Sequence, residues 1–253
     1  MPIQEYKRAY IWQLPVRIFH WANALALIVL IATGLLISHP PAIMSSGEAS
    51  TQFWFGYVRM IHFMSAYVMV AVLIMRVYWS FKGNKYSSWR VFFPFDKEGF
   101  TSIWHTVKHD IFLMNEKVYD YKKSVFVGHN DIAAISYLVM FILAFVMIFT
   151  GFGLYADNAT WFLPKMFAWV PEFLGGDMNT RVLHHLTMWA FILFSLVHVY
   201  LVLFHDWLEG RGESSAMISG YKFVRAERTE AVPKKETEKE TEKKIEKKIE
   251  KEK

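Results

Sequence analysis

Four histidines lie within long apolar stretches of the sequence, where an ionisable side chain is costly and a functional role is the first expectation. They are His20, His62, His184 and His198. His184 and His198 are 14 positions apart, which on an α-helix is about 40° short of four full turns. The two imidazoles would therefore share one face of a single helix, about 21 Å apart along its axis. This spacing predicts one metal site near each end of that helix.

The depth of each histidine in its apolar stretch predicts which of them meet. His62 falls near the same end of the bundle as His184, and His20 falls near the end that carries His198. Two facing imidazoles from different helices of a four-helix bundle can supply both axial ligands of a low-spin haem b. Such an iron carries electrons, because no axial position is left open for oxygen or substrate. We therefore expect one or two haems per chain, with His62 and His184 as the outer pair of ligands and His20 and His198 as the inner pair.

A simpler interpretation of these residues is structural. A single intramembrane histidine often only ties two helices together through a hydrogen bond. Four histidines at two matched depths fit that interpretation less well, because each would need its own polar partner in hydrocarbon. His185 adjoins His184 but points about 100° away around the helix, so it is the reserve ligand and not the expected one.

The sequence Arg-x-x-His occurs at three of the histidines. The arginines are Arg17, Arg59 and Arg181. Residues three apart lie on the same side of a helix, so each arginine could neutralise a haem propionate. Alternatively, the arginines mark the ends of the spans and reach the lipid headgroups. Small residues at Thr33–Gly34 and Thr150–Gly151 allow a ring or a neighbouring helix to approach closely.

The elements that must position these histidines are membrane spans. Hydrophobic residues make up 54% of the 253 residues and charged residues 20%, and much of the charge follows residue 225, so the remainder is far more apolar than a soluble protein. Four stretches are long and apolar enough to cross about 30 Å of hydrocarbon. They cover residues 18–37, 57–79, 132–155 and 182–204. The expected fold is an all-α integral membrane protein, a four-transmembrane-helix bundle with haem b held between helices.

The distribution of lysine and arginine predicts the orientation of the bundle. Loop 38–56 has neither residue, whereas loop 80–131 contains eight and the N-terminal arm contains Lys7 and Arg8, with Arg17 directly after it. The positive-inside rule then places both termini and loop 80–131 in the cytoplasm. No signal-peptide pattern precedes the first span, so we expect that span in the mature protein.

The chain is expected to divide into a membrane domain and three polar segments. These are an N-terminal arm (1–16), the haem-binding transmembrane domain (17–205), a juxtamembrane segment (206–225) and a charged tail (226–253). Within loop 80–131, residues 99–116 have spaced apolar positions that could form a helix on the inner membrane face. The tail has Glu and Lys three and four apart but almost no apolar face, which favours disorder or a frayed helix.

The chain has no cysteine, which excludes several kinds of redox site. A disulfide framework, a thiolate zinc site, a cysteine-ligated iron–sulfur cluster and covalent c-type haem attachment all require this residue. Any metal here must use His, Met or carboxylate ligands.

Several stretches give the chain a resemblance to a known family. They are PVRIFHWANALALIVLIATG (15–34), SGEAS (46–50), GYVRMIHFMSAY (56–67), MRVYW (75–79), GHN (128–130), MIFTGFGLY (147–155), LHHLTMWAF (183–191), VHVY (197–200) and SAMISGY (215–221). In their order and spacing they resemble the b-type cytochrome subunit of membrane-bound nickel–iron uptake hydrogenases. Arg181 departs from the family pattern, which often has a histidine there, and this weakens a propionate role for Arg181.

The resemblance implies an electron-transfer subunit of the bacterial inner membrane, with no hydrogen-oxidising site of its own. A periplasmic large subunit would oxidise hydrogen, and the iron–sulfur clusters of a small subunit would deliver electrons to the outer haem. The inner haem would then reduce a membrane quinone; no nucleic-acid partner is expected. Two alternatives stay open: a cytochrome subunit of a formate or thiosulfate enzyme, and a haem-free anchor or transporter that uses the histidines as a proton path.

Overall fold

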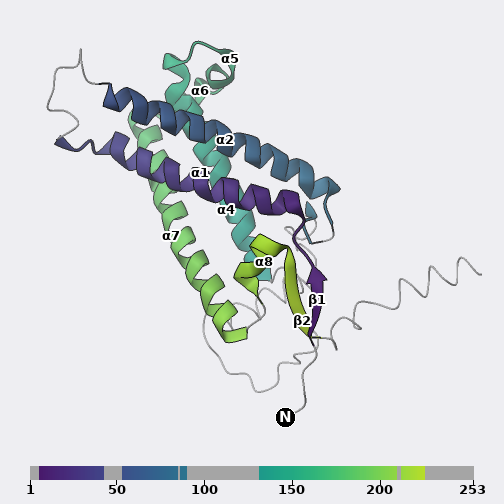
Figure 1. Ribbon diagram of the computed structural model, residues 1–253. Helices are drawn as coiled ribbons and strands as arrows, with labels where there is room; N and C mark the ends of the chain where they lie inside the picture. The colour runs from purple at the N-terminus through teal and green to yellow at the C-terminus, as the bar shows by residue number, and fades with distance from the viewer. Residues whose placement is uncertain (1–5, 43–52, 85, 90–130, 210–211, 226–253) are drawn as a thin grey trace, which may run out of the picture.

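Four long helices make up most of the part of the chain that the computed structural model describes, namely residues 6–42, 53–84, 86–89, 131–209 and 212–225 (Figure 1). They are α1 (Leu14–Ser38), α2 (Trp54–Lys82), α4 (Asp131–Tyr155) and α7 (Asp177–Glu209). Each is long and apolar enough to cross a membrane, which confirms the predicted membrane bundle. The helices extend past the predicted apolar spans because backbone hydrogen bonding continues into polar residues at the membrane surface. The predicted surface helix at 99–116 and the charged tail lie outside the described residues.

The four helices form two pairs. α1 packs along α2 and α4 packs along α7, and the two pairs cross at an angle (Figure 1). Aromatic side chains join one pair to the other: the ring centroids of Phe63 and Tyr155 are 4.4 Å apart. Those of Tyr67 and Phe152 are 5.5 Å apart. The pairs therefore meet through large side chains and not through close backbone contact.

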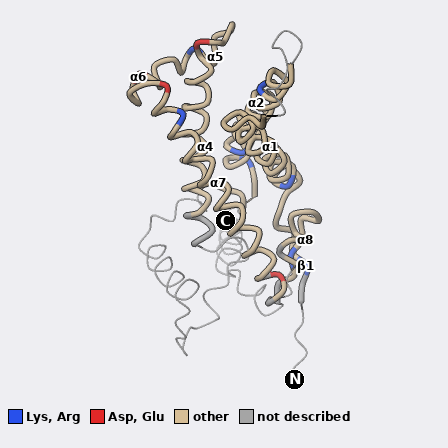
Figure 2. Tube along the Cα trace, turned by 90° about the vertical axis from the view of Figure 1, so that its left-hand side faces the viewer, with Lys and Arg blue, Asp and Glu red and all other residues tan. Residues whose placement is uncertain are grey.

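The outward-facing surface of the long helices is apolar. Leu25 and Ile28 on α1 are each 65% exposed, whereas the polar side chains of Thr33 and Thr150 are buried. Charged residues are absent from residues 18–37, 60–75 and 182–204 and lie near the helix ends in the described chain (Figure 2). Apolar side chains outside and hydroxyls inside suit a lipid environment, where a polar group must find its partner within the protein.

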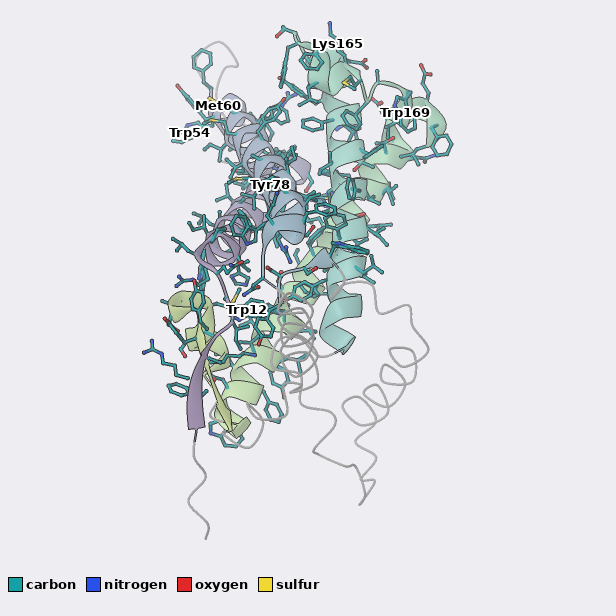
Figure 3. The ribbon with its side chains drawn as sticks, turned by 90° about the vertical axis from the view of Figure 1, so that its right-hand side faces the viewer. Trp12, Trp54, Met60, Tyr78, Lys165 and Trp169 are labelled. Atoms are coloured by element: carbon teal, nitrogen blue, oxygen red, sulfur yellow. The ribbon has the colours of Figure 1, made fainter. Side chains whose placement is uncertain are left out.

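The connection between α4 and α7 folds into short helices at one end of the molecule. These are η3 (Ala156–Asn158), α5 (Phe162–Lys165) and α6 (Trp169–Phe173). Gly153 on α4 allows α6 to approach, because a Cβ there would lie 3.1 Å from Val170 Cβ. Figure 3 shows Trp54, Lys165 and Trp169 together at this end, called here the Trp54 end, with Trp12 at the opposite end.

A small cap closes the other end, called here the Trp12 end. It comprises β1 (Tyr6–Tyr10), α8 (Glu213–Ser219), β2 (Tyr221–Arg225) and the turn after α2. β1 and β2 pair antiparallel, with Tyr10 opposite Tyr221, and the Arg8 guanidinium lies 3.9 Å from the centre of the Tyr221 ring. The sequence did not predict these strands, because five residues are too few for a clear alternation. The all-α expectation therefore holds for the membrane helices and not for this cap.

Both polar and apolar contacts hold the cap against α1 and α2. Ile11, Trp12, Val16 and Ala216 form its buried core. The Gln13 carboxamide oxygen accepts hydrogen bonds from the Trp79 indole at 3.1 Å and from the Asn84 backbone N–H at 2.9 Å. The Trp21 indole of α1 donates to the carbonyl of Met217 in α8 at 3.0 Å. The cap thus fixes the end of α1 that carries His20.

Replacing Gly220 with alanine is expected to destabilise the cap. Gly220 ends α8 at a φ of +88°, and an added Cβ would lie 2.7 Å from the Trp12 carbonyl oxygen. A left-handed conformation alone costs a residue with a side chain about 1–3 kcal/mol. Hydrogen exchange of the β1 and β2 amides should therefore be faster in Gly220→Ala. Gly56→Ala is the matched control, because a Cβ there meets nothing within 4 Å; equal exchange in the two variants would contradict the prediction.

Candidate functional site

The structure brings His20 and His198 together near the Trp12 end. His20 lies on α1 and His198 on α7, and their ring centroids are 6.3 Å apart with the planes inclined at 55°. Phe194, one turn before His198, stacks on the His198 ring with an interplanar angle of 9°. The Nδ1 atom of His20 is buried and has no hydrogen-bond partner among the described residues. These two rings form the predicted inner pair.

The spacing of the inner pair matches that of two ligands on one metal. Metal–imidazole nitrogen bonds are about 2.0–2.1 Å long, so two imidazoles on opposite sides of one ion have ring centroids about 6 Å apart. The observed separation of 6.3 Å needs little adjustment to reach that arrangement. The rings therefore fit axial ligation of a shared iron.

His62 and His184 both lie toward the Trp54 end, and each is held by a threonine of the neighbouring helix. The Thr33 hydroxyl of α1 lies 2.8 Å from Nδ1 of His62 in α2. In the same way, the Thr150 hydroxyl of α4 lies 2.8 Å from Nδ1 of His184 in α7. Each helix pair therefore contributes one threonine–histidine contact of the same kind.

The threonine contacts determine which nitrogen of each imidazole carries hydrogen. The Thr33 hydroxyl donates its proton to the Val29 carbonyl at 2.7 Å, and the Thr150 hydroxyl donates to the Val146 carbonyl at 2.6 Å. Each hydroxyl oxygen must then accept a hydrogen bond from the Nδ1–H of its histidine. The lone pair of a neutral imidazole is consequently on Nε2, where it can bind a metal.

Glycines beside the two threonines make room for the histidine rings. A Cβ at Gly34 would lie 3.5 Å from Cε1 of His62 and 3.7 Å from the sulfur of Met188. A Cβ at Gly151 would lie 3.2 Å from Cε1 of His184. Met188 is one turn beyond His184 on α7, so α7 and His62 share the surface of α1 around Gly34. His62 and the turn of α7 that follows His184 therefore meet at the same level of α1.

His185 points to a different neighbour. Its ring centroid is 6.3 Å from that of His39, at the end of α1. The Thr150 hydroxyl bonds to His184, and a Cβ at Gly151 would also lie against the His184 ring. The geometry therefore favours His184 over His185 as the partner of His62.

The arginines of the Arg-x-x-His sequences differ in their surroundings. The Arg17 guanidinium donates a hydrogen bond to the Ile218 carbonyl of α8, and its Nε atom is buried without a partner among the described residues. Arg59 and Arg181 are exposed. Arg17 thus connects the cap to the turn of α1 that carries His20, a contact that the spacing of the sequence did not reveal.

The hydroxyl contacts of Thr33 and Thr150 are the feature that sequence reasoning missed. The sequence indicates only that the doublets Thr33–Gly34 and Thr150–Gly151 permit close packing. A signal was present, because the same doublet occurs in two spans, 29 and 34 positions from the histidines that it contacts. A threonine inside a span usually bonds to its own helix, so only the structure shows the second contact.

Four membrane-spanning helices, with His20 beside His198 near one end and a threonine-bound histidine in each helix pair toward the other, suit a membrane cytochrome of the b type. The chain belongs to the prokaryotic cytochrome b561 family, whose model matches residues 11–220.

Relatives with closely similar names occur in several bacteria. A protein of Cupriavidus necator is 36% identical over 221 residues, covering 85% of this chain and 87% of the relative. One of Escherichia coli K12 is 35% identical and covers 84% of this chain and 90% of the relative. One of Azotobacter chroococcum is 31% identical and covers 90% and 94%. All three are named probable Ni/Fe-hydrogenase B-type cytochrome subunits, the second of hydrogenase 1.

Proposed function

We propose that the chain holds two haems b and carries electrons from a nickel–iron hydrogenase to a membrane quinone. His62 and His184 are the axial ligands of the outer haem, and His20 and His198 are those of the inner haem. The observation that carries this proposal is the 6.3 Å separation of the His20 and His198 rings, from two helices inside a membrane bundle. The haems supply one-electron chemistry, and the chain supplies their position and environment.

The residues around the outer ligands hold them in the form that iron requires. Thr33 and Thr150 fix the Nδ1–H tautomers, so that each Nε2 is free to bind. Gly34 and Gly151 leave space beside the imidazoles that a side chain would occupy. A haem iron held by two of these imidazoles would transfer electrons without binding a substrate at the metal.

The partner is inferred from the names of the relatives and from the composition of the chain. The relatives are named as subunits of Ni/Fe hydrogenases. With no cysteine, this chain cannot hold cysteine-ligated clusters of its own. We infer that the small subunit of a periplasmic hydrogenase delivers electrons through its clusters, while the large subunit oxidises hydrogen.

The distribution of charge supports an orientation with both termini in the cytoplasm of a bacterium, across its inner membrane. The described connection at the Trp54 end contains Asp157, Glu172 and Asp177 but only one lysine, Lys165, before Arg181. All three carboxylates are exposed. The positive-inside rule then places the Trp54 end in the periplasm, where these carboxylates face the hydrogenase. Quinone reduction is assigned to the Trp12 end, next to the inner haem.

Arg17 has a place in this arrangement at the inner haem. It is one turn from His20 and its Nε is buried without a partner among the described residues. A haem propionate near this guanidinium would receive a charge-assisted hydrogen bond. Arg59, which is exposed, has the corresponding position one turn from His62 and is proposed for the outer haem.

A reduced-minus-oxidised absorption spectrum with haem counted per chain tests the proposal. The purified full-length protein should show low-spin haem b at about two per chain, the number set by two bis-histidine pairs. Protein that stays colourless after expression with ample iron and haem precursor would refute it and favour a haem-free anchor or transporter. Co-purification with a formate or thiosulfate enzyme in place of a hydrogenase would leave the haems in place and refute only the partner.

A further inference from the structure

The two histidine pairs differ in the hydrogen-bond partners of Nδ1, the ring nitrogen that is not proposed to bind iron. In the outer pair, Nδ1 of both His62 and His184 is bonded to a threonine hydroxyl at 2.8 Å. In the inner pair, Nδ1 of His20 has no partner among the described residues. The His198 ring stacks face to face on Phe194, an apolar neighbour.

A hydrogen bond from Nδ1–H changes the electronic character of an imidazole ligand. When the Nδ1–H donates to an acceptor, the ring becomes more basic and stabilises the higher oxidation state of the metal. Second contacts of this kind are among the means by which proteins set haem potentials. The threonine oxygens are good acceptors here, because each hydroxyl already donates to a backbone carbonyl and is polarised by that bond.

If His62 and His184 hold one haem, as proposed, the two hydroxyls would act on the two ligands of the same iron. Thr33 and Thr150 come from different helix pairs, and each bonds to one of the two histidines proposed to hold the outer haem. Both effects therefore favour the ferric state of the outer haem. Among the described residues, no hydroxyl bonds to His20 or His198 in the same way. The ferrous state of the inner haem is therefore relatively favoured.

We propose that Thr33 and Thr150 are positioning residues that lower the reduction potential of the outer haem below that of the inner haem. This inference rests on the proposed function, in particular on haem ligation by His62 and His184. An electron that the outer haem delivered to the inner haem would then move downhill, toward the quinone. The hydrogen bonds of Thr33 and Thr150 would thus favour electron transfer from the outer haem to the inner haem.

The test is a potentiometric titration of the visible haem absorbance in the purified full-length protein. In Thr33→Val and in Thr150→Val, the midpoint of the outer haem should rise while the inner midpoint stays in place. Loss of one hydrogen bond should change the ratio of ferrous to ferric outer haem about tenfold at a fixed potential. For a one-electron couple this tenfold change is about 59 mV. The midpoint of the outer haem is identified as the one that is missing from the titration of His184→Ala.

Serine variants and a threonine elsewhere on α7 provide the controls. Thr33→Ser and Thr150→Ser keep the hydroxyl and should retain the original midpoint. Thr187 is also buried, and its hydroxyl donates to the Leu183 carbonyl at 2.8 Å, with no hydrogen bond to an imidazole among the described residues. Thr187→Val should therefore leave both midpoints unchanged. If a valine variant loses haem, the comparison of Thr→Ser with Thr→Ala at the same site decides, because these differ by the hydroxyl alone.

Three results would overturn the inference. They are a valine or alanine variant with full haem and an unmoved outer midpoint, an equal shift in Thr187→Val, and an outer midpoint above the inner one in the unmodified protein. Failure of the proposed function is distinguishable, because it would appear as missing haem in the unmodified protein or as full haem in His62→Ala.

Discussion

His184→Ala is expected to lose the outer haem and to stop electron transfer from the hydrogenase. The protein should keep about one haem per chain, because the inner pair does not share a ligand with the outer pair. With its receiving site missing, hydrogen-dependent quinone reduction should fall more than about 100-fold, since even weaker disturbances of a metal site cost 10–100-fold. Haem per chain and hydrogen-to-quinone activity of the purified complex are the measurements. Dye-linked hydrogen oxidation by the partner should persist.

His185→Ala is the matched control for this variant. It removes an imidazole from the adjacent position of the same helix, but His185 lies beside His39 and not beside Thr150. Haem content and activity should therefore stay near those of the unmodified protein. If His184→Ala retains both haems, or if His185→Ala loses one, the assignment of the outer ligands is wrong.

His198→Ala is expected to separate electron entry from quinone reduction. Hydrogen should still reduce the outer haem, because Thr33, His62, Thr150 and His184 are untouched. That haem should then remain reduced when quinone is added, since the inner haem proposed to pass the electron onward would be absent. Stopped-flow absorbance of the complex, mixed first with hydrogen and then with quinone, measures both steps.

His20→Ala provides an independent check, because His20 belongs to another helix but faces the same proposed iron. The two variants should lose the same haem, with the same remaining midpoint in a redox titration. Fast reoxidation of the outer haem by quinone in either variant would contradict a serial path through the inner pair.

Much of the membrane architecture could be predicted because hydropathy is a local property of the sequence. Twenty or so apolar residues in a row must form a helix in lipid, where every backbone group has to be bonded within the segment. The matched depths of the histidines follow in turn from the regular rise of a helix. For this reason the four spans and the pairing of His20 with His198 could be worked out from the sequence.

The cap could not be predicted in the same way. Tyr10 and Tyr221 are opposite each other in a strand pair although they are far apart in the sequence. Neither five-residue strand has a signal strong enough to identify it, and each is stable only when the other pairs with it. The contact of Arg17 with Ile218 likewise depends on α8 folding back against α1.

The sequence by itself determined that this is a four-span membrane protein with imidazoles at two depths and no cysteine, because composition and helical periodicity are carried by neighbouring residues. Only the tertiary structure decided that Thr33 reaches His62, that Thr150 reaches His184, and that His185 turns toward His39. The physical reason is that a hydrogen bond forms only within a few tenths of an ångström of its preferred length and along its own direction. Such contacts depend on how two helices are placed against each other, which no stretch of one helix specifies.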